Sequence, residues 1–287
     1  MAARRWQLQL GDPLVGGARS AVFAATDARG RDLVLKLPAA AAGSDATIEA
    51  AALRVWAGSG AAVTLVDSTA DALLLVRARP GQLMPWQPET PLTDVIALAG
   101  ELLRRLWSAT PGGYHYPALA EIYPDNERVT RADSAFEQRQ RGEPLRGTLG
   151  LRRLPAAAVT AERLISTAPS PVLLHGDFVS KNLVTDASSP VGWVALDPLP
   201  MVGDPSAEVA AFAAYQPAGM ILPIAEALAH EVGVDPRRVL AWTAIWAVHQ
   251  AAQAWRDDQE QLDDLITSTV IDSLLKARGS WPSPRPA

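Results

Sequence analysis

The order in which strand-like and helix-like patterns follow one another constrains this fold more than any other feature. Before residue 77, short apolar runs bounded by turn residues predict strands, and one longer Ala-rich segment predicts a helix. After residue 91, apolar residues recur mainly at helical spacing. The sequence therefore predicts an α+β protein of two lobes, with a small β lobe over residues 1–77 and a larger, mainly helical lobe over residues 78–287.

The first lobe is expected to contain five strands and one helix, in the order three strands, helix, two strands. The helix begins at Ser44 or Asp45, either of which suits a helix N-terminus, and ends near Trp56. The predicted strands are Trp6–Leu10, Ser20–Asp27, Asp32–Pro38, Ala61–Ser68 and Asp71–Ala78. Prolines then dominate Arg77–Pro91, which is typical of a linker.

Helical periodicity dominates the second lobe, with one exception. The predicted helices are Thr93–Ser108, Pro155–Thr167, Ala207–Tyr215, Leu222–Glu231, Pro236–Trp255 and Gln261–Ala277. Between the second and the third of these lies a short β region, Val172–Asp197. This region contains the polar residues that point to a function.

The composition excludes several classes of protein. Because the 287 residues include no cysteine, neither a disulfide framework nor a thiolate metal site is possible. A net charge of -5 argues against a nucleic-acid binder, whose affinity depends on a cationic surface. No apolar run reaches the roughly 18–20 residues that a membrane span needs. The N-terminus does not resemble a secretory signal, so we expect a cytoplasmic protein.

Polar side chains gather where the strands of the β region end. The segment LLHGDFVSKNLV places Asp177 after one apolar strand and Asn182 before the next, and Asp197 follows a third apolar strand. Phosphoryl transfer needs such a set, because one carboxylate activates the attacking hydroxyl while an amide and a second carboxylate hold Mg²⁺. The alternative interpretation is a turn that uses Asp and Asn as caps.

These residues resemble the catalytic loop and metal-binding aspartate of protein kinases, and the His-Gly-Asp form is similar to the aminoglycoside phosphotransferase family. ALDPLPMVGDP, Ala195–Pro205, resembles the group of streptomycin 6-phosphotransferases and hydroxyurea phosphotransferases. The resemblance implies a bilobal protein-kinase-like fold. It also implies that Asp177 is the general base and that Asn182 and Asp197 bind Mg²⁺.

The first lobe contains the residues expected to bind ATP. Lys36 lies in an apolar strand of a chain with only three lysines. In the kinase template such a lysine meets the nucleotide phosphates and is held by a helix glutamate, here Glu49. The alternative is a surface lysine on an edge strand.

A glycine-rich turn and a hinge complete the expected nucleotide site. Two glycines in a hairpin are also an ordinary turn, so both interpretations of that segment stay open. Leu75–Arg79 is expected to form the hinge, where backbone groups would meet the adenine. The residues assigned to the turn are Gly16, Gly17 and Ser20, and those assigned to the hinge are Val76 and Ala78.

Three positions depart from the pattern of the relatives. Arg77, in the hinge, stands where relatives often have an acid. Glu208 stands where they commonly carry an Asp that supports the catalytic loop. Lys181 either reaches the γ-phosphate beside Asp177 or is a solvated loop lysine, and the two interpretations are equally open.

Acidic residues in the second lobe are candidates for the acceptor site. Asp204 either faces the acceptor or caps the helix that begins at Pro205, and the two roles are not exclusive. Asp257 and Asp258 either attract a cationic acceptor or solvate a helix junction. Aromatic residues on the predicted helix Pro236–Trp255 are interpreted as core packing.

The resemblance implies an ATP- and Mg²⁺-dependent phosphotransferase that acts on a hydroxyl of a small molecule, first of all an aminoglycoside such as streptomycin. Asp197 and Asp204 are only seven residues apart, which leaves no long activation segment and favours a small acceptor over a protein. A kinase of a sugar, amino sugar or other metabolite is one alternative, and a non-catalytic nucleotide-binding module is another. The sequence does not distinguish ATP from GTP and predicts no oligomeric state.

Overall fold

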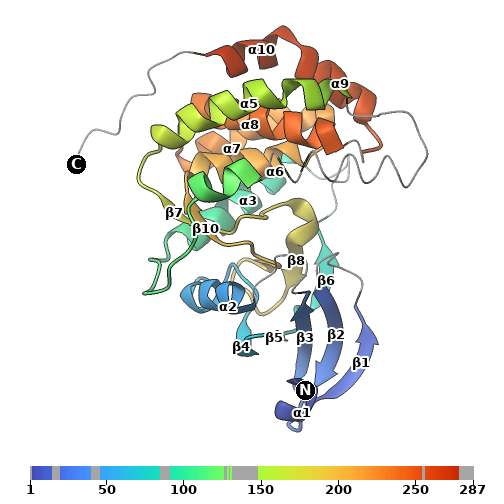
Figure 1. Cartoon of the computed structure of the whole chain (residues 1–287). Coiled ribbons are helices and arrows are strands. Elements are labelled where there is room, and N and C mark those ends of the chain that lie inside the picture. Colours follow the sequence, from blue (N-terminus) through green and yellow to red (C-terminus); the bar gives the residue numbers. More distant parts are fainter. Residues whose placement is uncertain are drawn as a thin grey trace. The chain divides into compact units, whose positions relative to one another are not determined.

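The computed structural model describes residues 2–14, 20–39, 46–84, 91–125, 128, 130, 148–253 and 256–277. The chain forms two compact units (Figure 1). The first unit comprises Met1–Pro85, Glu101–Tyr116 and His175–Pro200, and the second comprises Trp86–Gly100, Pro117–Leu174 and Met201–Ala287. The segment with the predicted catalytic residues therefore packs with the N-terminal part of the chain. The expected lobe boundary near residue 77 stays a prediction.

A five-stranded antiparallel sheet and one helix form the N-terminal part of the first unit, which confirms the predicted fold class. The strands are β1 (Gln9–Pro13), β2 (Ser20–Thr26), β3 (Asp32–Pro38), β4 (Leu65–Thr69) and β5 (Ala72–Val76), in the order β1-β2-β3-β5-β4. Helix α2 (Ala46–Val55) connects β3 to β4. The first strand was predicted too early, because a short helix, α1 (Ala2–Arg5), precedes it and Trp6 packs on the sheet.

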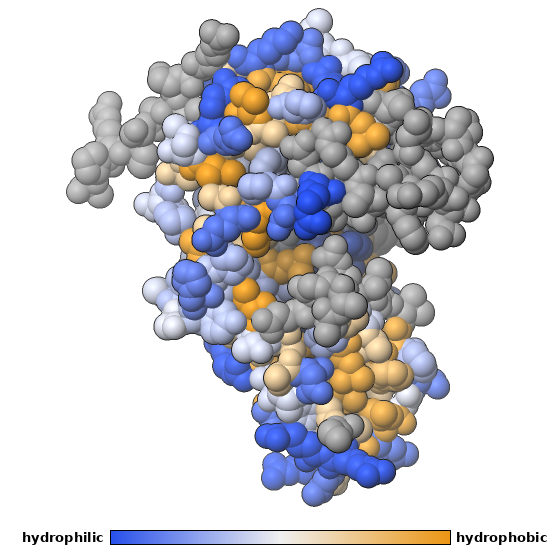
Figure 2. Space-filling view, viewed as in Figure 1, coloured by the Kyte–Doolittle hydropathy of each residue, from blue (hydrophilic) through white to orange (hydrophobic). Residues whose placement is uncertain are grey.

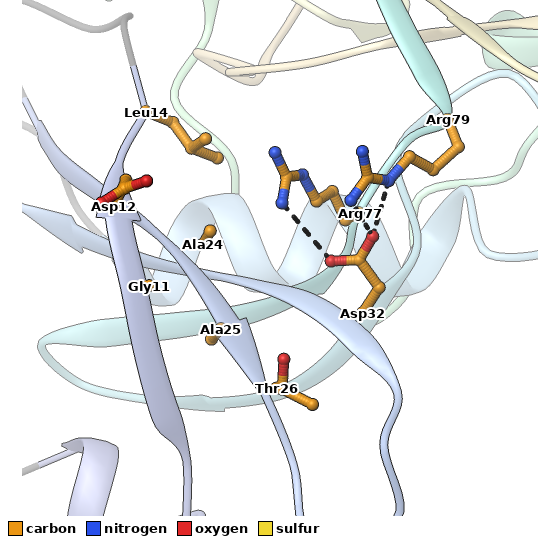
Figure 3. A pocket seen from close by; sticks show the side chains of 9 residues that line it. All are labelled: Gly11, Asp12, Leu14, Ala24, Ala25, Thr26, Asp32, Arg77 and Arg79. Atoms are coloured by element: carbon orange, nitrogen blue, oxygen red, sulfur yellow. Dashed lines mark hydrogen bonds and ion pairs between the residues drawn. The ribbon is translucent and has the colours of Figure 1, made fainter.

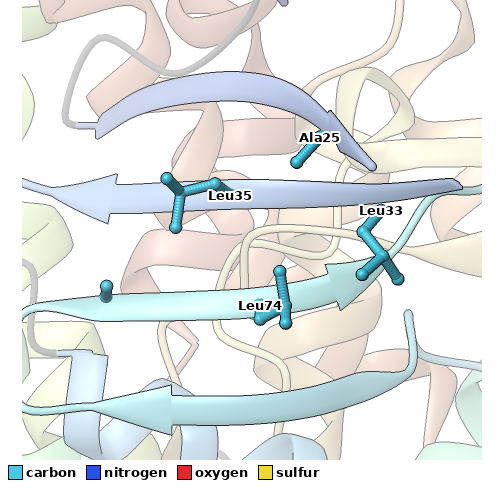
Figure 4. Close-up of a cluster of buried hydrophobic side chains, with 5 residues drawn as sticks. Ala25, Leu33, Leu35 and Leu74 are labelled. Carbon is cyan, nitrogen blue, oxygen red and sulfur yellow. The ribbon is translucent and has the colours of Figure 1, made fainter. Parts of the chain in front are cut away.

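One face of this sheet is the hydrophobic core of the N-terminal part. Ala25, Leu33, Leu35 and Leu74 meet there (Figure 4), and the N-terminal residues around Trp6 pack against them. Because successive side chains of a strand point to opposite faces, Asp32, Val34 and Lys36 lie on the other face. Apolar side chains also reach the surface over β1 and β2 (Figure 2), where Leu10 is 45% exposed.

A second sheet in the first unit joins the predicted hinge segment to the segment with the predicted catalytic residues. Its strands are β6 (Pro80–Leu83), β8 (Leu183–Asp186) and β9 (Trp193–Ala195), in the order β6-β8-β9. The proline-rich segment is therefore not wholly a linker. Pro80 is tolerated because it begins an edge strand, where no neighbour needs its missing N–H. Residues 85–90 of the expected linker lie outside the described residues.

The second unit is mainly helical (Figure 1). It contains α5 (Thr148–Ser166), α6 (Pro205–Ala214), α7 (Ile221–Val232), α8 (Pro236–Gln253), α9 (Gln259–Thr267) and α10 (Thr269–Lys276), with α3 (Leu92–Trp107) divided between the units. Two short strands, β7 (Val172–Leu174) and β10 (Met201–Gly203), pair beside them.

Helix α8 is the centre of the second unit and packs against α5, α6 and α7. Gly150 permits the close approach of α5, because a Cβ at this position would lie 2.3 Å from the backbone N of Ala252. The helix predicted over Gln261–Ala277 is two helices instead. It breaks at Ser268, which has an extended backbone and caps α10 by accepting a hydrogen bond from the N–H of Ile271.

Candidate active site

Lys36 lies at the centre of a buried charge cluster in the first unit. Its Nζ is 2.7 Å from Oε1 of Glu49 on α2 and 3.0 Å from Oδ1 of Asp197. Lys36 is only 4% exposed and Glu49 3%, whereas the side chain of Asp197 is 39% exposed. The structure thus brings Lys36 and Glu49 together and adds Asp197 at the open side of the pair.

The electrostatics of this cluster keep Lys36 charged. Burial alone would lower the pKa of Lys36, but the carboxylates of Glu49 and Asp197 outweigh burial and raise that pKa. Burial raises the pKa of Glu49, and the ammonium of Lys36 opposes this shift. A charged ammonium held between two carboxylates is suited to bind a phosphate oxygen.

Asp177 and Asn182 are joined on the loop that precedes β8. The side-chain amide of Asn182 donates from Nδ2 to Oδ2 of Asp177 at 2.7 Å and to its backbone O at 2.9 Å. These bonds use the amide nitrogen, so the amide oxygen of Asn182 is left as an acceptor for another partner. Nζ of Lys181 lies 3.8 Å from Oδ2 of Asp177, and its side chain is 53% exposed.

Aromatic packing supports this loop from inside. His175 is fully buried, stacks on Trp56 with ring centroids 5.9 Å apart, and meets the edge of Phe178. Burial lowers the pKa of His175 to about 3, so its ring is neutral at physiological pH. Gly176, with φ of +80°, provides the left-handed turn that brings Asp177 out of the strand. Trp56 follows α2 directly, so the stack connects the helix of Glu49 to the loop of Asp177.

The two residues before Asp197 are held by main-chain bonds to two neighbouring segments. The N–H of Ala195 donates to the O of Ala61 at 2.8 Å, and the N–H of Val63 donates to the O of Ala195 at 3.0 Å. The N–H of Leu196 donates to the O of Asn182 at 2.8 Å. Asp197 itself has φ of +55°, an uncommon conformation for a residue other than glycine. Sequence reasoning missed this bonding, because nothing in the pattern of residues 61–63 signals a partner more than 130 positions away.

The sheet face that carries Lys36 continues as a strip of small and apolar side chains. In the register of β2 and β3, Val22 lies opposite Lys36, Ala24 opposite Val34, and Thr26 opposite Asp32. A pocket of about 470 Å³ lies at the far end of this strip (Figure 3). Its lining residues are Gly11, Asp12, Leu14, Ala24, Ala25, Thr26, Asp32, Arg77 and Arg79.

The hinge segment begins where β5 ends. The N–H of Val76 donates to the O of Thr64, and the N–H of Arg77 donates to the O of Asp32. Within the described residues, neither backbone group of Ala78 has a backbone partner, so both are available to a ligand. Ser20 begins β2, opposite Pro38. The other turn residues, Gly16 and Gly17, lie outside the described residues.

The acidic acceptor candidates have mainly structural contacts in the second unit. Asp204 is 1% exposed and caps α6 by accepting from the N–H of Ser206. Its other oxygen accepts from Nε of Arg238 at 2.6 Å and Nε1 of Trp242 at 2.7 Å. The structure therefore shows the cap role of Asp204, and partners bond to both carboxylate oxygens of this buried side chain.

Three other acids of the second unit were singled out from the sequence, namely Asp257, Asp258 and Glu208. Asp258 pairs with Arg256 and accepts from the N–H of Ala218, which gives it a structural role at the start of α9. Asp257, beside it, is exposed, and Glu208 is buried within α6.

Oxygen ligands of the first unit fit Mg²⁺. Mg²⁺ usually binds one or two protein oxygens and completes its shell with phosphate oxygens and water. Asn182 offers its free amide oxygen, and the partly exposed Asp197 offers a carboxylate. Among the described residues, no group of three or more His, Cys, Asp or Glu side chains could hold a metal ion, so the amide oxygen of Asn182 is part of the candidate site.

None of the helices that the structure describes is both long and apolar enough to cross a membrane.

Comparison with known proteins identifies relatives in sequence and in structure. A sequence model of the aminoglycoside/hydroxyurea antibiotic resistance kinases matches residues 5–259. A hydroxyurea phosphotransferase from Kitasatospora aureofaciens is 29% identical over 247 residues, which are 83% of this chain and 67% of that protein.

Two solved structures share the fold. A choline/ethanolamine kinase family protein from Mesorhizobium loti has a TM-score of 0.59 at 16% identity, and the match covers 95% of this chain and 90% of that one. Aminoglycoside phosphotransferase APH(3'')-Id from Streptomyces rimosus, in complex with ADP and streptomycin, has a TM-score of 0.54 at 21% identity, with 85% and 92% covered. At such identities the likeness shows the fold alone, which is protein-kinase-like as predicted.

Proposed function

Because this chain belongs to the family of aminoglycoside/hydroxyurea antibiotic resistance kinases, and is thus a small-molecule phosphotransferase, we propose that it transfers the γ-phosphate of ATP to a hydroxyl of its acceptor. One observation carries the proposal. Lys36 joins Glu49 to Asp197, in the same compact unit that holds the Asp177–Asn182 pair. A phosphate-binding cation, two metal-binding oxygens and a candidate base are the groups that phosphoryl transfer needs.

The buried cluster is the phosphate end of the nucleotide site. Lys36 binds a phosphate oxygen, and Glu49 keeps its ammonium in place at 2.7 Å. Ser20, at the start of β2, is the described residue of the turn that is expected to cover the phosphates. At the other end of the nucleotide, the free backbone groups of Ala78 meet the base, together with the backbone of Val76, whose N–H already donates to Thr64.

Asn182 and Asp197 would hold Mg²⁺ through the amide oxygen and the carboxylate. A Mg²⁺ ion bound there would supply positive charge to the phosphate oxygens during transfer. Lys36 is bonded to Asp197 at 3.0 Å, so the same carboxylate positions the phosphate-binding cation.

Asp177 activates the acceptor. Its carboxylate is 31% exposed and is held by the side chain of Asn182, so it accepts a hydrogen bond from the acceptor hydroxyl and takes its proton. The hydroxyl oxygen then forms a bond to the γ-phosphorus while the bond to the bridging oxygen of ADP breaks. Lys181, 3.8 Å from Asp177, places a positive charge beside the transferred group.

The first candidate acceptor is an aminoglycoside such as streptomycin. Hydroxyurea is the second candidate, because the relative from Kitasatospora aureofaciens is a hydroxyurea phosphotransferase. A sugar, amino sugar or other metabolite remains the third. Because the acids Asp204 and Asp258 have structural partners, the exposed Asp257 is the acid of this group left to attract a cationic acceptor.

The test is Mg²⁺- and ATP-dependent ADP release with streptomycin, hydroxyurea, simple sugars and amino sugars as acceptors. We expect turnover with one class, and Asp177→Asn to retain ATP binding while losing about 10²–10⁴-fold in kcat. Glu162→Gln, the same change from acid to amide at an exposed position of α5, is the matched control. Wild-type turnover in Asp177→Asn would show that Asp177 is not the base.

A further inference from the structure

Two arginines of the hinge segment share one carboxylate at the start of β3. Asp32 accepts from Nε of Arg79 at 2.6 Å, and its other oxygen lies 3.5 Å from the Nη1 of Arg77. Figure 3 shows these three side chains together on one side of the pocket, with Leu14 and Asp12 of the β1 segment on the other. Asp32, on a different strand, thus supplies the carboxylate that Arg77 meets.

The cluster of Asp32, Arg77 and Arg79 lies at a defined distance from Lys36. Asp32 and Lys36 lie on the same strand and the same face, four residues apart, which corresponds to about 13 Å along an extended strand. A nucleotide whose phosphates are bound at Lys36 reaches this far only with its nucleoside end. The pocket has room for that group, since its volume is about 470 Å³.

The floor of the pocket suits a flat ring. Small residues form it, and Gly11 and Ala24 approach so closely that a Cβ on Gly11 would lie 3.3 Å from the Cβ of Ala24. Thr26 adds a hydroxyl at the outer end. Such a floor offers a smooth surface without side chains that would fill the space.

Arg77 is suited to form the opposite wall. Its side chain is 27% exposed and is restrained by Asp32, so it loses little freedom when a ligand binds. A guanidinium can stack on an aromatic ring or donate to its acceptor atoms, and a lysine ammonium reproduces neither the plane nor the fork of donors. Arg79, at 58% exposure, is more open to solvent and is bonded to the same carboxylate.

We propose that Arg77, held by Asp32, is a specificity-determining residue that contacts the nucleoside moiety of the phosphate donor. The proposal rests on the proposed function, because it takes Lys36 as the phosphate end of the site. Asp32 acts as a positioning residue, and Arg79 balances its charge.

The test compares two ligands that share phosphate chemistry and differ in the nucleoside. Calorimetry measures the Kd of ADP and of inorganic tripolyphosphate, each with Mg²⁺. For Arg77→Ala we expect ADP binding to weaken by about five- to tenfold, with tripolyphosphate unchanged. Arg77→Lys, which keeps the charge, should restore less than half of the lost affinity on a logarithmic scale. Arg31→Ala is the matched control, since Arg31 forms an Arg–Asp pair with Asp27 outside the pocket.

Several outcomes overturn the proposal. Equal weakening of both ligands in Arg77→Ala would mean that Arg77 acts on the phosphates. An unchanged Kd for ADP, or equal weakening in Arg31→Ala, would remove the nucleoside contact. Lys36→Met separates this inference from the proposed function, because it should weaken both ligands. If it does so while Arg77→Ala has no effect, the proposed function stands and the inference fails.

Discussion

Acidification should destabilise this protein through protonation of His175. This contribution to the loss of unfolding free energy can be measured separately from that of the carboxylates. The pKa of His175 is about 3 in the folded protein, against 6.5 for an ordinary histidine, because burial disfavours the charged ring. Between pH 6.5 and pH 3, His175 is therefore mostly protonated in the unfolded chain and mostly neutral in the folded protein. The stability that this neutral ring contributes is complete above pH 6.5 and is lost as the pH falls from 6.5 towards 3.

The magnitude follows from the shift. Each pH unit within this window removes about 1.4 kcal/mol of unfolding free energy, so lowering the pH from 7.5 to 5.0 should cost about 2 kcal/mol through His175 alone. His175→Phe keeps an aromatic ring between Trp56 and Phe178 but cannot titrate. Its unfolding free energy should therefore fall by about 2 kcal/mol less than that of the wild type over the same range.

The assay is urea unfolding followed by tryptophan fluorescence at pH 7.5 and pH 5.0. The difference in unfolding free energy between pH 7.5 and pH 5.0 is taken within each protein. This cancels any change in stability that the larger phenylalanine ring causes at both pH values. The same replacement at the exposed His230 controls for an added apolar ring. An equal loss in wild type and His175→Phe would refute the reasoning, because it would show that the ring is hydrated or charged in the folded state.

Three further predictions concern the metal, a buried network and the aromatic stack. Asn182→Leu should raise the Mg²⁺ concentration required for half-maximal turnover by about tenfold or more, measured by ADP release, because it removes one oxygen ligand and the amide that holds Asp177. Asp204→Asn should lower the unfolding free energy by about 3–5 kcal/mol in chemical denaturation, because it leaves the buried cation of Arg238 without its carboxylate. Trp56→Leu should reduce kcat more than it raises the KM for ATP, because it loosens the contact between α2 and the catalytic loop, and Trp56→Phe should recover most of the loss. A larger effect on KM would assign Trp56 to nucleotide binding instead.

The parts that sequence reasoning predicted depend on local chemistry. The alternation around Lys36 identifies a strand whatever it packs against, and the five-residue spacing of Asp177 and Asn182 is short enough for one loop to join them. The cap at Asp204 is equally local, because Asp before Pro favours a helix start on its own.

The parts that it missed depend on residues far away in the chain. The strand Pro80–Leu83 exists only because β8, about a hundred residues later, pairs with it. Nothing in the sequence around Asp204 indicates that Arg238 and Trp242 donate hydrogen bonds to its second carboxylate oxygen. The break at Ser268 was missed because the apolar spacing continues through it, although the serine itself is a good cap.

The bonds between residues 61–63 and Ala195 have a consequence for how this protein can change. They are made by backbone atoms, but Ala61, Ala62 and Val63 are buried, so only side chains of similar size and polarity preserve them. The alignment of Glu49 with Asp197 thus restricts which side chains the segment that connects them can carry. A lineage that explores new acceptors with other parts of the chain should keep small apolar residues there, so that the proposed phosphate-transfer groups keep their relative positions. Saturation mutagenesis of residues 61–63 should accordingly yield active variants mainly with small apolar side chains, and none with proline at Val63, which removes the N–H that donates to Ala195.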